Sequence, residues 1–115
     1  MRREDAIRIQ HMIEAAEAAE SFASGRARKD MDDDKQFAFA LARAIEIFGE
    51  AASKISAETP ATLPNIQWRL AIGMRNRIVH AYFDINFNVV WRTATEELPA
   101  LPPLLRAALG DDAPR

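Results

Sequence analysis

The chain has 115 residues, enough for one hydrophobic core but not for two, so we expect a single domain over residues 1–115. Hydrophobic residues make up 49% and charged residues 28% of the sequence, which excludes an intrinsically disordered chain. The net charge of −2 argues against a domain that tracks a nucleic-acid duplex, because such domains are usually strongly basic.

Two long helices are predicted in the N-terminal half. Apolar residues recur at helical spacing over residues 4–24, and Gly25 is suited to end this first helix. The second helix is predicted over residues 35–57. Asp32–Asp34 supply its N-cap and first-turn acids, and Pro60 closes it.

The C-terminal half predicts three further helices. One opens at Pro64 and covers residues 64–82, because proline suits the first helical position. Another covers residues 89–98, and a short last helix follows over LLRAALG. The predicted fold is therefore all-α, an antiparallel bundle of four helices plus a short C-terminal helix.

The predicted helix over residues 64–82 is apolar on more than one side. One row consists of Ile66, Leu70, Met74 and Ile78, and a second row consists of Trp68, Ile72, Val79 and Phe83. A helix with two apolar sides must bury both of them. We expect one side to face the core and the other to face a second copy of the chain, which predicts a homodimer.

The end of this helix carries the polar stretch RNRIVHAY, residues 75–82. On a regular helix Asn76 and His80 share a face, whereas Arg75 and His80 lie about 140° apart around the axis. Two copies of the helix packed together would place the arginine, asparagine and histidine of each chain in one shared groove. Arginine pairs with phosphate and histidine transfers protons at neutral pH, so this set suits metal-independent cleavage of RNA through its 2′-OH.

The motif formed by Arg75, Asn76, His80 and Tyr82 resembles the signature of the HEPN superfamily, and its HepT-like toxin ribonucleases are the most similar branch. RAIEIFGEAASKIS, PNIQWRLAIGMRNRIVHAYFDI and VVWRTATEELPALPPLL extend the likeness along most of the chain. The resemblance implies a HEPN-like homodimer with endoribonuclease activity and catalytic Arg75, Asn76 and His80.

The resemblance also implies a regulatory partner. Members of this branch pair with a minimal nucleotidyltransferase antitoxin, as in a type VII-like toxin–antitoxin system, and this partner attaches AMP to the motif tyrosine, here Tyr82. The resemblance also allows a larger assembly of toxin and antitoxin. An AMP ester would place bulk and negative charge where the RNA phosphate should lie, which would silence the enzyme.

Other interpretations of these residues are available. We interpret Arg77 as a surface or interface residue, and Tyr82 could be a packing residue. The whole chain could instead be a non-catalytic helical adaptor that binds a nucleotidyltransferase or a nucleotide. That reading predicts that no RNA is cleaved.

Metal or cofactor chemistry is not expected. The histidines, His11 and His80, are not part of a Glu-x-x-His pair, and His11 reads as part of a solvated helix face. Glu46 and Glu50 read as a surface charge ladder with Arg43 and Lys54, although an approach of Glu50 to the groove stays open. With four glycines and no glycine-rich phosphate loop, the chain is not expected to bind ATP as an enzyme would.

The charge pattern and the cysteine count bear on partners and location. Residues 65–92 contain four arginines and one acid, a local charge of +3 that suits contact with one or two phosphates. The chain has no cysteine, which fits a reducing cytoplasm. The first ten residues lack the apolar core of a secretion signal, and no apolar run is long enough for a membrane span, so we expect a cytoplasmic protein.

Overall fold

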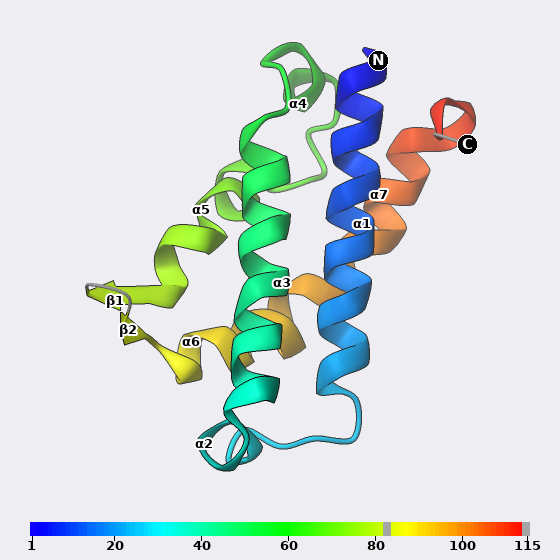
Figure 1. The fold of residues 1–115 in the computed structure, drawn as a ribbon. Helices are drawn as coiled ribbons and strands as arrows, with labels where there is room; N and C mark the ends of the chain where they lie inside the picture. Colours follow the sequence, from blue (N-terminus) through cyan, green and yellow to red (C-terminus); the bar gives the residue numbers. More distant parts are fainter. Residues whose placement is uncertain (82–83, 114–115) are drawn as a thin grey trace.

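The computed structural model describes the backbone of residues 1–81 and 84–113 and the side chains of residues 1–78 and 84–113. Two long helices, α1 (Arg3–Ala23) and α3 (Lys35–Ser53), lie side by side and run in opposite directions (Figure 1). The predicted antiparallel arrangement is therefore confirmed for the first two helices.

The remaining helices pack on this pair. α5 (Trp68–Ile78) contacts α3, and α7 (Leu101–Leu109) contacts α1 on its other side (Figure 1). The shorter elements are α2 (Asp30–Asp33), α4 (Glu58–Thr62), β1 (Val79–Ala81), β2 (Asp84–Ile85), α6 (Phe87–Arg92), η1 (Thr93–Glu97), η2 (Leu98–Ala100) and η3 (Gly110–Asp112). The chain is mostly helical, as predicted, but it is divided into more and shorter helices than the predicted four plus one.

The end of the first helix and the start of the second follow their sequence signals. Gly25 adopts a positive φ of 73°, which only glycine tolerates readily, and α1 ends just before it at Ala23. At the start of α3, Asp34 Oδ1 accepts a hydrogen bond from the backbone N–H of Phe37 at 3.1 Å. This bond, together with the nearby Arg26, lowers the pKa of Asp34.

The prolines lie at different helical positions from those predicted. Pro60 does not close α3, which already ends at Ser53, but lies in the first turn of the separate helix α4. Pro102 and Pro103 likewise lie in the first turn of α7. The first N–H groups of a helix have no intrahelical partner, so a proline loses no hydrogen bond there. Pro64, by contrast, lies in a turn, and α5 begins only at Trp68.

The predicted extension of the third helix to Tyr82 is wrong over its last described residues. α5 ends at Ile78, and β1 then pairs antiparallel with β2. The backbone N–H of Asn86 also donates to Ile78 O at 2.8 Å. Pairing with this later segment satisfies the backbone and favours the extended form for Val79, a β-branched residue, so the tertiary contact overrides the helical pattern. Tyr82 itself lies outside the described residues.

The predicted helix over residues 89–98 is also irregular. α6 starts at Phe87, where the Asn86 side chain accepts hydrogen bonds from the N–H groups of Asn88 and Val89. It then widens into the π-helical turn η1 and tightens into the 3-10 turn η2, which contains Pro99. The missing N–H of proline removes one α-helical hydrogen bond, which accounts for the break at this point.

The core lies between α1, α3, α5 and α7. Its largest fully buried side chains include Ile9, Met12, Leu41, Ile45, Phe48, Met74, Ile78 and Leu105. One carboxylate is buried with them: Asp5, whose side chain is 2% exposed. It accepts hydrogen bonds from Ser56 N at 2.9 Å, Ser56 Oγ at 2.5 Å and Thr59 Oγ1 at 2.6 Å, and so ties the start of α1 to α4.

No described helix combines the length and the apolar character that crossing a bilayer requires.

Candidate functional site

Two residues of the motif, Arg75 and Asn76, lie in the last turns of α5. Met74 and Ile78, one turn apart, are fully buried against the core. This fixes the rotation of the helix, because residues four apart share a face. Arg75 and Asn76 therefore point away from the core, and both are exposed. The structure brings these two predicted site residues together on one exposed part of α5.

The arginines at positions 75 and 77 differ in their partners. Arg77 forms an ion pair with Glu97 at 3.3 Å and also contacts Leu70 O at 3.5 Å. Arg75 forms no hydrogen bond or ion pair with any residue that the structure describes. The Arg77 guanidinium thus forms contacts within the chain, which agrees with its interpretation as a surface residue. The donors of Arg75 stay available for an outside oxyanion such as a phosphate.

The other two motif residues are placed only in part. The backbone of His80 lies in β1, directly after α5, and its side chain is outside the described residues, as is the whole of Tyr82. Because His80 lies on a strand, the helical angle between Arg75 and His80 does not apply. In the described backbone, Arg75 lies in α5 and His80 lies in β1, which follows α5 directly.

Behind Arg75, α3 comes very close to α5. Gly49 of α3 lies against the backbone N and the Cβ of Arg75 and against Ala71 O. The motif does not include Gly49. A glycine in the middle of an otherwise strong helical pattern is the signal that marks such a contact.

The carboxylates of α3 behave as the charge ladder that their spacing predicts. Arg43 pairs with Glu46, and Lys54 pairs with Glu50, both at 3.3 Å. Arg8, His11, Arg43, Glu50 and Lys54 also line a shallow hollow of about 190 Å³ between α1 and α3. His11 is exposed, as predicted. Glu50 is thus engaged with Lys54.

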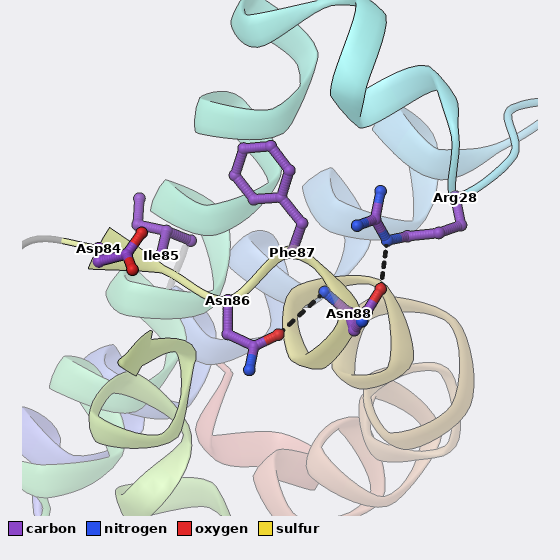
Figure 2. A pocket seen from close by; sticks show the side chains of 6 residues that line it. All are labelled: Arg28, Asp84, Ile85, Asn86, Phe87 and Asn88. Atoms are coloured by element: carbon purple, nitrogen blue, oxygen red, sulfur yellow. Dashed lines mark hydrogen bonds between the residues drawn. The ribbon is translucent and has the colours of Figure 1, made fainter. Parts of the chain in front are cut away.

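A second hollow, of about 340 Å³, adjoins β2, the strand that pairs with the His80 segment. Figure 2 shows the side chains at its rim. Arg28 Nε donates to Asn88 Oδ1 at 2.7 Å, and Asn86 Oδ1 accepts from Asn88 N at 3.1 Å. These side chains already bond to one another and cap α6. They therefore hold the segment after the motif in place.

Three large apolar side chains on α3 and α5 are exposed. Phe39 and Ile47 of α3 are 53% and 39% exposed, and Ile72 of α5 is 42% exposed. Trp68, placed by spacing in one row with Ile72, is buried at 8% exposure. These two members of that row thus differ: Ile72 is exposed and Trp68 packs in the core. Val79 and Phe83, the other members of that row, have no described side chains.

In the described part of the chain, no three or more histidine, aspartate or glutamate side chains come together in an arrangement that holds a metal ion.

Comparison with known proteins points to one family. A family model described as "Ribonuclease HepT-like" matches residues 12–108. A protein of Thermococcus cleftensis named "Probable ribonuclease HepT" is 37% identical over 93 residues, which cover 81% of this chain and 84% of that protein. No solved structure matches significantly.

Two further relatives are named as candidate RNases. One, from Methanocaldococcus jannaschii, is 33% identical over 64% of this chain and 72% of its own length. The other, from Caldanaerobacter subterraneus subsp. tengcongensis, is 27% identical over 88% of this chain and 90% of its own length. The family model covers the exposed Arg75 and Asn76 as well as His80 and Tyr82. The chain belongs to the HepT-like ribonuclease family of the HEPN superfamily.

Proposed function

We propose that this chain is a single-domain, metal-independent endoribonuclease whose catalytic residues are Arg75, Asn76 and His80. The observation that carries the proposal is the guanidinium of Arg75 on the exposed end of α5, which pairs with no described residue, in a chain of this family. Arg77, two residues further on, is paired with Glu97. This difference in partners supports different roles for the two arginines.

The reaction follows from the chemistry of these groups. His80 takes the proton of a ribose 2′-OH, and the oxygen attacks the adjacent phosphorus. The bond from phosphorus to the 5′-oxygen breaks, and this oxygen takes a proton from water as it leaves. Arg75 stabilises the negative charge that develops on the phosphate oxygens, and Asn76 orients the phosphate by hydrogen bonding. The products are a 2′,3′-cyclic phosphate and a 5′-OH.

The proposed active form is a homodimer that meets along α5 and the neighbouring face of α3. Phe39 of α3 and Ile72 of α5 are large apolar side chains left in water by the single chain, and burying them is favourable. Ile72 lies three and four residues before Arg75 and Asn76, so it shares their side of α5. A twofold contact there would bring both copies of the motif into one groove.

Regulation by a minimal nucleotidyltransferase antitoxin is part of the proposal, as in a type VII-like toxin–antitoxin pair. The partner would transfer AMP from ATP to the Tyr82 hydroxyl, close in sequence to His80, and pyrophosphate would leave. The phosphate of the AMP ester would then repel the RNA backbone electrostatically. Intact-mass measurement after co-expression with such a partner should show added AMP units that a Tyr82→Phe chain lacks, and an unmodified mass would count against this part.

The ribonuclease proposal is tested with purified unmodified protein and RNA in excess EDTA. We expect cleavage to continue, and we expect new ends that carry a 2′,3′-cyclic phosphate. A substrate with a deoxyribose at the cut position should stay intact, because it lacks the attacking hydroxyl. Loss of cleavage in EDTA that Mg²⁺ restores, or no cleavage under any condition, would overturn the proposal, and the second result would favour the adaptor reading.

A further inference from the structure

We infer that Gly49 is a positioning residue for Arg75, an inference that rests on the proposed function. α3 and α5 cross at this glycine. A Cβ placed on Gly49 would lie 3.1 Å from the backbone N of Arg75 and 3.2 Å from its Cβ. It would also lie 3.5 Å from Ala71 O, one turn earlier on α5. The contact therefore falls on the backbone of the catalytic arginine itself.

The first two distances are shorter than ordinary van der Waals contacts of a Cβ atom, and the atoms that they reach are not flexible. Arg75 N and Cβ belong to a helix whose neighbouring residues Met74 and Ile78 are fully buried. A side chain at position 49 would thus be accommodated by moving α5 by a few tenths of an ångström rather than by rotating a side-chain end.

The exposed guanidinium of Arg75 makes this contact important for catalysis. No described residue forms a hydrogen bond with the Arg75 side chain. The position of this side chain therefore depends on the Arg75 backbone and Cβ, which α3 supports. Catalytic groups need placement to within about 0.5 Å, and an error of about 1 Å can cost about 10²-fold in rate. The absence of a side chain at Gly49 lets the two helices approach to the distance that places Arg75.

The chain offers a matched control. Gly73 lies on α5 two residues before Arg75, and a Cβ placed there meets nothing within 4 Å. Gly73 lines the side of the helix that carries Leu70 and Arg77. Both glycines are within helices, so alanine raises the helix propensity at either position. The two substitutions differ in whether they displace Arg75.

The test compares Gly49→Ala with Gly73→Ala in single-turnover and steady-state RNA cleavage. We expect Gly49→Ala to lower kcat about three- to fivefold, in proportion to a shift of a few tenths of an ångström, with little change in KM or circular dichroism. Gly73→Ala should keep the wild-type kcat. In an Arg75→Lys background, the loss from Gly49→Ala should be clearly smaller than in the Arg75 chain, because the group that it misplaces is already compromised.

Three outcomes would overturn the inference. They are a Gly49→Ala chain with wild-type kcat, a loss that multiplies fully with Arg75→Lys, and a Gly49→Ala chain that no longer folds, which would assign the contact to stability. In each case an active wild type and an inactive Arg75→Ala chain would leave the proposed function standing. A wild type that cuts no RNA would instead remove the proposed function.

Discussion

Replacing Arg75 with alanine is expected to reduce the rate of RNA cleavage by about 10²–10³-fold, the usual effect of removing one group that stabilises a transition-state oxyanion. The side chain is exposed at the end of α5 and has no partner among the described residues. Its removal therefore leaves no buried group unpaired, and the fold should survive. The measurement is single-turnover cleavage of a labelled RNA, with melting temperature recorded in parallel.

Arg77→Ala is the matched control for this prediction. It removes the same side chain from the same helix, but the lost contact is an exposed ion pair with Glu97 at 3.3 Å. Such pairs contribute about 0–1 kcal/mol, so both stability and the cleavage rate should stay close to wild type. Equal rates in the Arg75→Ala and Arg77→Ala chains, whether high or low, would show that Arg75 has no special role.

Replacing Asp5 with alanine is expected to lower the free energy of unfolding by about 2–3 kcal/mol. The carboxylate is buried and accepts three hydrogen bonds from Ser56 and Thr59. Without it, the Thr59 hydroxyl and the Ser56 N–H and hydroxyl lose their partner in or near the core, which carries the larger part of the cost. Urea unfolding followed by circular dichroism measures the difference.

The same carboxylate predicts how stability depends on pH. Burial raises the pKa of Asp5, but the hydrogen bonds from Ser56 and Thr59 and the nearby Arg2 outweigh it and leave the pKa lowered. A lowered pKa in the folded state means that Asp5 stabilises the fold above its unfolded pKa of about 4. This contribution is lost as pH falls through the folded pKa. The gap in stability between wild type and Asp5→Ala should therefore shrink below about pH 4.

Glu58→Ala serves as the control at the same junction. Glu58 pairs with Arg2 at 2.8 Å, but its side chain is 71% exposed, so we expect a change within about 1 kcal/mol. A similar loss in the Asp5→Ala and Glu58→Ala chains, or a gap that widens with acidification, would contradict the role given to Asp5.

The sequence was most informative where the signal is local. Gly25 and Asp34 end and start helices through their own backbone and side-chain chemistry, and both act as predicted. The exposure of Arg75 and Asn76 likewise follows from the periodicity of α5, because Met74 and Ile78 fix its rotation.

The features that were missed depend on distant segments. The strand at Val79–Ala81 forms because Asp84–Ile85 returns to pair with it, and no pattern within RNRIVHAY records that pairing. The close approach of Gly49 to Arg75 likewise depends on how α3 and α5 cross. Trp68 was placed in one row with the exposed Ile72 by spacing, but it is buried and its indole N–H donates to Leu63 O at 3.1 Å, a contact before α5 that the helical pattern does not record.

In the proposed dimer both copies of the motif share one groove, and we propose that Arg75 of one subunit and His80 of its partner act on the same phosphodiester there. The most direct measurement uses a hybrid dimer in which one subunit carries Arg75→Ala and the other His80→Ala, isolated through two different affinity tags. Each variant alone should be inactive. The hybrid still contains one intact arginine and one intact histidine on opposite subunits, so it should cut RNA at a substantial fraction of the wild-type rate. A hybrid as inactive as its parents, or a wild-type chain that cuts RNA as a monomer, would contradict the claim.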